Sequence, residues 1–256
     1  MPNYLITGAN RGLGLGFITT LAKDQSNTVI GLVRDQKAAE EQVLPTEFNN
    51  VYFVEADIVD TKALKLAAER VQEIVGAAGL DVLICNAAEH DIQAAIADTR
   101  ASIDVNVVGS LKAVNAFLPH IRKGGLKKVV AVSSGMGDID FINEARISNA
   151  APYATSKAAL STLFAKLGTA YEDEGILFMS LCPGLVDTAI GPPSLSEGDL
   201  LRFQNITARF EKYAPGFKAT SPTDAAQKCL AAIERSSLQG GSGGSFLSHN
   251  GTKRWM

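Results

Sequence analysis

The sequence has few of the residues that mark several classes of protein. Three cysteines occur among 256 residues, Cys85, Cys182 and Cys229. An odd number of widely spaced cysteines does not form a disulfide framework, so we expect reduced thiols. Of the three histidines, none has a second ligand at metal-binding spacing, which predicts no metal site. Long apolar runs are missing too, since no stretch approaches the roughly 18 residues that a membrane-spanning helix needs.

Charge and the first residues exclude further classes. The formal net charge is −3, which does not suggest a nucleic-acid or polyanion partner. The chain begins MPNYLITGAN, with no basic segment followed by an apolar stretch of signal-peptide length. We therefore expect a cytoplasmic protein that does not bind membranes. Hydrophobic residues make up 46% of the chain, enough to bury a large core.

Short runs of β-branched residues alternate with longer segments of helical periodicity. We expect strands at 3–7, 28–33, 51–55, 81–85, 128–133 and 176–182, with a short last strand at 245–247 after a glycine-rich turn. Helices are expected at 13–22, 61–75, 99–117 and 153–171. The strands are too apolar to alternate, as is typical of a sheet covered on both faces. We predict an α/β fold: a Rossmann-like, doubly wound parallel sheet with helices on both faces.

One segment does not follow this alternation. Residues 184–217 contain prolines at 192, 193 and 215 and a helical stretch at 198–212. Loops of this kind often close over a site, so this segment is a candidate lid. No internal repeat or interdomain linker is visible, and we expect one domain over residues 1–256.

A glycine-rich sequence follows the first expected strand. TGANRGLG, residues 7–14, lies between that strand and the first helix. Glycine lets the backbone approach a diphosphate closely, and a helix N-terminus supplies free amides and the positive end of a dipole. The spacing Gly-x-x-x-Gly-x-Gly differs from the commoner dinucleotide fingerprint, so its position carries more weight than its pattern. Cofactor contacts are predicted for Gly8, Asn10, Arg11, Gly12, Leu13 and Gly14.

The end of the second expected strand bears on which nicotinamide cofactor binds. An acidic residue there hydrogen-bonds a free ribose hydroxyl, whereas an arginine pairs with a 2′-phosphate. This strand ends VIGLVRD, so Arg34 is the predicted phosphate partner and Arg11 a second positive charge. The sequence therefore predicts NADP(H). Two solvated surface arginines are the alternative, and Asp35 leaves NAD open.

A tyrosine and a lysine four positions apart form the predicted proton-transfer pair. Tyr153 and Lys157 lie in YATSK, where helical spacing puts them on one face. A tyrosine hydroxyl titrates at about pH 10, and a nearby cation favours the phenolate, so we expect Lys157 to lower the pKa of Tyr153. The preceding strand brings Ser133 and Ser134 to the sheet edge, where a hydroxyl can hold a carbonyl. Asn106, in mid-helix, could order a water for proton relay.

In chain order, these elements resemble a short-chain dehydrogenase/reductase over nearly the whole sequence. The matches are TGANRGLG, Asp57 after the third strand, NAA at 86–88, Asn106, the serine pair, YATSK and PGLVDT at 183–188. The resemblance implies a catalytic tetrad of Asn106, Ser134, Tyr153 and Lys157. It places Asp57 near the adenine and Asn86 near the nicotinamide. The further cofactor contacts that it implies are Asp57, Ile58, Asn86, Ala87, Tyr153, Lys157, Pro183, Gly184, Val186 and Thr188.

The sequence departs from the usual pattern of the family at two places, and it contains two candidates for the catalytic serine. Ser134 is preferred to Ser133, because the serine of the family is usually followed by two residues and a glycine. NAA replaces the usual Asn-Ala-Gly, which is a mild change. The 19 positions from Ser134 to Tyr153 are more than is typical, and we expect the extra segment, residues 137–150, to line the substrate pocket.

The arginines of the loop and second strand, with the C-terminal FLSHNGTKRW, resemble carbonyl-reductase-like members, including ketoreductases of the norsolorinic acid type. The resemblance implies reduction of a ketone or aldehyde carbonyl by NADPH, reversible as alcohol oxidation. An apolar pocket for a bulky aromatic substrate is predicted from Phe141, Ile142, Ile147 and residues 195–213. The resemblance implies that this substrate is polyketide-like.

Two other functions and the assembly stay open at this point. The fold could bind NADP(H) without turnover, as a redox sensor or scaffold, since a fold does not fix a function. The pocket could also assist a cyclisation, dehydration or epimerisation. Members of the family often assemble through the helices that here carry Asn106 and Tyr153, which is compatible with a homodimer or homotetramer.

Overall fold

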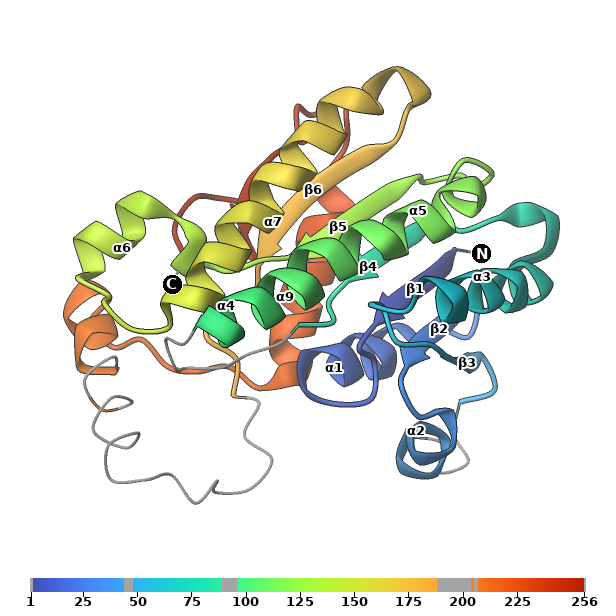
Figure 1. Ribbon diagram of the computed structural model, residues 1–256, viewed down its shortest axis with the longest axis horizontal. Coiled ribbons are helices and arrows are strands. Elements are labelled where there is room, and N and C mark those ends of the chain that lie inside the picture. Colours follow the sequence, from blue (N-terminus) through green and yellow to red (C-terminus); the bar gives the residue numbers. More distant parts are fainter. Residues whose placement is uncertain (1, 44–47, 89–95, 188–203, 205–206, 256) are drawn as a thin grey trace.

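A single parallel sheet forms the centre of the molecule (Figure 1). The computed structural model describes residues 2–43, 48–88, 96–187, 204 and 207–255. Seven strands lie in the order β3-β2-β1-β4-β5-β6-β7, and every neighbouring pair is parallel. Their bounds are β1 (Asn3–Thr7), β2 (Thr28–Val33), β3 (Val51–Glu55), β4 (Val82–Cys85), β5 (Lys128–Val132), β6 (Leu177–Cys182) and β7 (Phe246–Ser248).

The strand order confirms the predicted doubly wound sheet. The chain runs outward from β1 to β3 and then returns to place β4 beside β1. The register pairs Ile6 with Ile84 and Cys85 with Ala131, so the loops that follow β1, β4 and β5 leave the sheet at one edge. In open α/β sheets, ligands bind in the crevice at such a reversal of strand order. The path of the backbone alone therefore brings the predicted site residues to one edge of the sheet.

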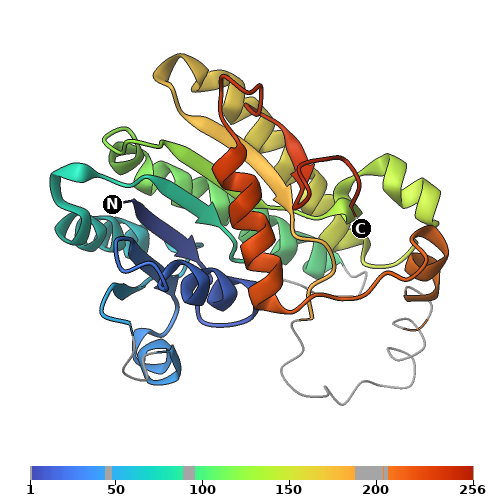
Figure 2. The ribbon, with the colours of Figure 1, turned by 180° about the vertical axis from the view of Figure 1, so that it is seen from behind.

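Helices cover both faces of the sheet. They are α1 (Gly12–Leu21), α2 (Gln36–Val43), α3 (Thr61–Val75), α4 (Ile96–Ile103), α5 (Ser110–Ile121), α6 (Ile139–Ala145), α7 (Ala151–Ala170) and α9 (Pro222–Arg235). Helices α1 and α9 pack on one face, and α3, α5 and α7 pack on the other. One buried cluster of apolar side chains lies under each of these two groups of helices. Figure 2, from behind, shows α9 crossing the sheet beside α1. All residues of β4 and β6 are buried, which explains their continuous apolar sequences.

The structure extends and corrects the expected helices. Helices α2, α6 and α9 were not predicted, although Ser221 and Pro222 give α9 a recognisable start: the Ser221 side chain caps the helix and Pro222 follows it. The helix expected at 99–117 runs instead from Ile96 to Ile121 and contains a π-helical turn, Asp104–Gly109. It continues past Pro119 because the amides of Arg122 and Lys123 still bond to carbonyls of the last turn.

The remaining expectations concern loops. The glycine-rich sequence before the last strand is a turn, as predicted, and the amide of Gly244 bonds to Phe178 of β6. Most of the candidate lid, 188–203 and 205–206, lies outside the described residues. None of the helices in the described ranges combines the length and the apolar character needed to cross a membrane. Those ranges also contain no group of three His, Cys, Asp or Glu side chains that could hold a metal ion.

Candidate active site

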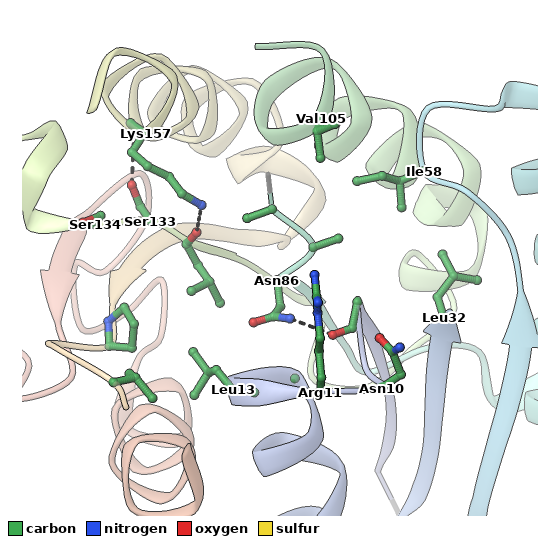
Figure 3. Close-up of a pocket in the computed structure, with 18 of the residues that line it drawn as sticks. Asn10, Arg11, Leu13, Leu32, Ile58, Asn86, Val105, Ser133, Ser134 and Lys157 are labelled. Atoms are coloured by element: carbon green, nitrogen blue, oxygen red, sulfur yellow. Dashed lines mark hydrogen bonds between the residues drawn. The ribbon is translucent and has the colours of Figure 1, made fainter. Parts of the chain in front are cut away.

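A cavity of about 600 Å³ lies at the edge of the sheet where β1, β2, β4 and β5 end. Figure 3 shows Arg11 and Asn10 at one end of it and Ser134 and Lys157 at the other. Asn106 does not line the cavity, and Thr188 lies outside the described residues. The other predicted site residues all line it: Gly8, Asn10, Arg11, Gly12, Leu13, Gly14, Arg34, Asp57, Ile58, Asn86, Ala87, Ser134, Tyr153, Lys157, Pro183, Gly184 and Val186.

The glycine loop has a shape that only glycine permits. Gly8 and Gly12 have φ angles of 67° and 54°, in the left-handed region that other residues avoid. A Cβ at Gly14 would lie 2.1 Å from the Gly8 carbonyl oxygen. Helix α1 starts at Gly12, within this glycine-rich sequence, with no side-chain cap and no acidic residue in its first turn. Its first amides and its dipole are therefore directed at the cavity without internal compensation, which fits the diphosphate of a dinucleotide.

Asn86 braces this loop. Its side-chain amide donates to the carbonyls of Thr7 and Gly8 at 3.0 and 3.1 Å. The Thr7 hydroxyl accepts from the amides of Asn86 and Ala87, both at 3.0 Å. The end of β4 is thus tied to the loop that follows β1. The side-chain amide of Asn86 is used for this tie, although the sequence placed the residue near the nicotinamide.

The two charged residues at the end of β2, Arg34 and Asp35, face different surroundings. Arg34 is exposed and lines the cavity, as does Arg11 in the glycine loop. Asp35 does not line the cavity, and its carboxylate accepts a hydrogen bond from the Ala38 amide at 2.9 Å. The acidic group at this position therefore serves the start of α2, while the cation faces the site.

Lys157 and the two serines take distinct positions around α7. The Lys157 side chain is buried, and its Nζ donates to the Val132 carbonyl at 2.8 Å. The Ser133 hydroxyl donates to the Lys157 carbonyl at 3.1 Å and shares a 2.7 Å hydrogen bond with Ser161. Ser133 is therefore turned toward α7, whereas Ser134 begins the short 3₁₀ turn Gly135–Gly137. This geometry favours Ser134, the serine preferred from the sequence.

Burial shifts the pKa values of both members of the Tyr153–Lys157 pair. It raises the pKa of Tyr153 to about 12, against a smaller lowering by a hydrogen bond with Ser134. It lowers the pKa of Lys157 to about 8. The expectation that Lys157 lowers the pKa of Tyr153 is therefore wrong for this structure. The ammonium lies over the tyrosine ring, 5.5 Å from its centroid, and donates its hydrogen bond to Val132.

Asn106 acts on α7 from outside the cavity. It is fully buried in the π-helical turn, a feature that is frequent at functional sites. Its side-chain amide donates to the Ser156 hydroxyl at 2.8 Å, and that hydroxyl donates to the Tyr153 carbonyl at 2.7 Å. Asn106 therefore holds the turn of α7 that carries Tyr153 and Lys157.

The apolar residues near the site are arranged differently from the sequence expectation. Phe141 and Ile147, expected to line the pocket, are buried in a cluster with Phe210 and Trp255 and do not line the cavity. Most of residues 195–213 lie outside the described residues. Met136, which the sequence did not single out, lines the cavity and packs against that same cluster. Its only sequence signal is its place two residues after Ser134.

Comparison with known proteins identifies the family. The model of the family described as short chain dehydrogenase matches residues 3–197. The chain belongs to the short-chain dehydrogenase family. It is 42% identical over 270 residues to the short-chain dehydrogenase/reductase AacuF of Aspergillus aculeatus, and 39% identical over 274 residues to the short chain dehydrogenase virK of Hypocrea virens. Each alignment covers 100% of both proteins.

Solved structures of short-chain dehydrogenases have the same fold. An NADPH-bound carbonyl reductase from chicken fatty liver superposes with a TM-score of 0.80 at 27% identity, over 98% of each chain. The resemblance seen in the sequence is thus confirmed. This short-chain dehydrogenase is an oxidoreductase of a family that uses nicotinamide cofactors.

Proposed function

We propose that this short-chain dehydrogenase reduces the carbonyl group of an apolar ketone or aldehyde with NADPH. One observation carries the proposal: the cavity that Ser134, Tyr153 and Lys157 line is also lined by the glycine loop, with its Arg11, and by Arg34. Phosphate-binding and proton-transfer groups therefore meet in one space. The likeness to a carbonyl reductase that binds NADPH supports the same function.

The cofactor assignment rests on the charges around the cavity. The uncapped N-terminus of α1 and its glycine loop would hold the diphosphate. Arg34 and Arg11 would pair with the 2′-phosphate that distinguishes NADPH from NADH. Asp57, whose carboxylate accepts from the Val59 amide at 3.0 Å, would lie near the adenine. The competing acid, Asp35, already caps α2.

The proposed chemistry uses the hydroxyls of Ser134 and Tyr153, at the end of the cavity away from the glycine loop. When bound, NADPH supplies the hydride that reaches the carbonyl carbon. The Ser134 and Tyr153 hydroxyls would hold the carbonyl oxygen, and Tyr153 would give it a proton as negative charge develops there. A pKa of about 12 keeps Tyr153 protonated in neutral solution, which a proton donor requires. The Lys157 ammonium, which lies 5.5 Å from the centroid of the tyrosine ring, would bind the ribose hydroxyls of the cofactor.

The apolar character of the substrate is supported by the cavity wall. Met136 follows Ser134 by two residues, and Leu185 and Val186 follow Gly184, and all three of these apolar side chains line the cavity. An apolar wall around two convergent hydroxyls is typical of a site for a small molecule that is oriented by one polar group.

Turnover with each cofactor tests the proposal. Reduction of a panel of aromatic ketones and aldehydes would be followed at the nicotinamide absorbance band, with NADPH and with NADH. We expect a preference for NADPH in kcat/KM, reduced about 10- to 100-fold in Arg34→Ala, as expected for a lost charged hydrogen-bonding pair. Arg70→Ala, on the exposed surface of α3, is the matched control. NADPH binding without turnover of any carbonyl would favour the sensor or scaffold function, and binding of neither cofactor would overturn the proposal.

A further inference from the structure

The last described residues of the chain turn back toward the serine turn, the 3₁₀ turn Gly135–Gly137 that begins after Ser134. After β7, the Ser248 amide donates to the Thr252 carbonyl at 2.7 Å, and the His249 amide to the Cys182 carbonyl at 2.8 Å, which holds this segment against the end of β6. Trp255 follows and is 3% exposed. Figures 1 and 2 both show the C-terminus beside α6, on the side of the sheet edge where the site lies.

Trp255 is in direct contact with the backbone beside Ser134. A Cβ at Gly135 would lie 2.7 Å from both Cβ and Cγ of Trp255, a distance at which one of the two residues would have to move. The indole also stacks on Phe246 of β7, with ring centroids 4.4 Å apart and planes 26° apart. The indole is therefore fixed between β7 and the serine turn.

A second glycine packs the same turn against α7. A Cβ at Gly137 would lie 2.6 Å from the Ala158 amide nitrogen, one residue beyond Lys157. Inside the turn, the Met136 amide donates to the Ser134 hydroxyl at 3.2 Å and the Gly137 amide to the Ser134 carbonyl at 2.9 Å. The turn thus packs closely against two neighbours, against Trp255 at Gly135 and against α7 at Gly137.

We infer that Trp255 is a positioning residue for the carbonyl substrate. It presses the Ser134 turn against α7 and so sets the distance from the Ser134 hydroxyl to Tyr153, together with the place of Met136 in the cavity wall. The inference rests on the proposed function, because the placement of Ser134 matters to turnover only if a carbonyl binds there. The phosphate end of the cavity is formed by other elements, and Trp255 has no role in it.

The kinetic test separates positioning from a merely structural role. Misplacement of a substrate-holding group by about 1 Å can lower turnover by about 100-fold, so we expect Trp255→Ala to lower kcat/KM for the carbonyl by about 10- to 100-fold. Trp255→Phe, which keeps a ring in place, should recover much of this loss. NADPH affinity should stay within about twofold in both variants, a binding free-energy change of about 0.4 kcal/mol. Lys253→Ala, in an exposed part of the same segment, is the control.

A measurement without turnover tests the contact itself. Trp255 is the single tryptophan of the chain, so its emission reports its surroundings directly. Gly135→Ala should displace the indole, shifting its emission to longer wavelength and increasing its quenching by acrylamide. Gly125→Ala is the control, because a Cβ there would lie 3.4 Å from Asp81 Oδ1, an ordinary van der Waals distance.

Each outcome bears on one claim. Unchanged emission in Gly135→Ala, or an unchanged kcat/KM in Trp255→Ala of an enzyme that reduces carbonyls, overturns the role of Trp255 and leaves the proposed function standing. Equal losses of NADPH affinity and carbonyl turnover would show a general structural effect and also overturn it. A wild-type protein that binds NADPH but reduces no carbonyl overturns the proposed function instead.

Discussion

Tyr153 and Lys157 respond to burial in opposite directions, and the result suits proton donation. Burial favours the neutral form of each group, which raises the pKa of the phenol to about 12 and lowers that of the ammonium to about 8. In neutral solution the tyrosine is therefore protonated, and most of the lysine is still charged. Reduction of a carbonyl needs a protonated tyrosine to give the proton, and a charged lysine can bind the ribose hydroxyls of the cofactor.

Removing the Tyr153 hydroxyl tests the proton donor. We expect Tyr153→Phe to lower kcat for carbonyl reduction by about 10²- to 10⁴-fold, the usual contribution of a positioned general acid. NADPH binding, measured by fluorescence titration, should persist because the phosphate end is untouched. Tyr171→Phe is the control, since that ring packs on Phe178 at the far end of α7. An unchanged rate in Tyr153→Phe would contradict the assignment.

The pKa of Lys157 predicts how carbonyl reduction depends on pH. Burial lowers it from 10.5 to about 8, so the ammonium is present below about pH 8 and is lost as the pH rises through that value. We therefore expect kcat/KM to fall above about pH 8, while Tyr153 stays protonated. Cys182 is a further titratable group that faces the pair, and burial raises its thiol pKa, away from the range in which Lys157 titrates.

A lysine replacement distinguishes this explanation from others. In Lys157→Arg the guanidinium keeps its charge throughout the alkaline range. The fall in kcat/KM above about pH 8 should then disappear, even if the absolute rate is lower. A fall at the same pH in Lys157→Arg would assign the titration to another group.

Several residues could be found from the sequence and others could not. The spacing of Tyr153 and Lys157 fixes their common helix face, so the pair was predicted. The direction of their pKa shifts was not, because burial depends on what the whole fold places around them. The contact between Gly135 and Trp255 has no signal in the sequence, since 119 other residues separate the two.

At the scale of elements, α1 and α9 pack through a glycine. A Cβ at Gly16 would lie 2.5 Å from the Pro222 carbonyl oxygen at the start of α9. Backbone atoms cannot rotate away as a side chain can, so α9 would have to shift. Because α1 also begins at the glycine loop, its close packing on α9 fixes the helix N-terminus that lines the cavity where the cofactor phosphates are proposed to bind.

Substitution of that glycine should therefore destabilise the protein. Overpacking of a well-packed contact typically costs about 1–3 kcal/mol, and the gain in helix propensity from glycine to alanine, up to about 1 kcal/mol, offsets part of that cost. We expect Gly16→Ala to lower the free energy of unfolding by up to about 2 kcal/mol, the difference of those two effects, as measured by urea denaturation. Gly125→Ala should have little effect. A more stable Gly16→Ala protein would show that α9 moves freely over α1.

Elements were predicted well where one local rule decides them. The buried strands are continuous apolar runs, and all were found with ends correct to within a residue. The π-helical turn at Asp104–Gly109 was missed because it depends on how Asn106 meets Ser156 of α7. Helix α6 was missed because its apolar residues, Phe141 among them, were assigned to a pocket wall instead of a buried cluster.

At the scale of the molecule, the site spans both halves of one sheet. The glycine loop follows β1, the Ser134 turn follows β5, and Trp255 follows β7 at the edge of the sheet. The two buried clusters run under helices from both halves: one joins α1 to α9 and the other joins α3 to α7. The sheet cannot be divided into two halves between β1 and β7 without exposing the apolar side chains of one of these clusters.

Thermal unfolding should therefore be a single transition for the chain. Emission of Trp255 reports on the C-terminal half, and far-ultraviolet circular dichroism reports on all helices and strands. We expect both signals to change at one midpoint temperature, and saturating NADPH to raise both by the same amount, because a ligand at 100 times its Kd adds about 2.7 kcal/mol to the whole cooperative unit. Arg34→Ala should reduce both shifts together. An early Trp255 transition that NADPH leaves in place would show instead that the C-terminal segment unfolds as a separate unit, and the chain would not be one domain.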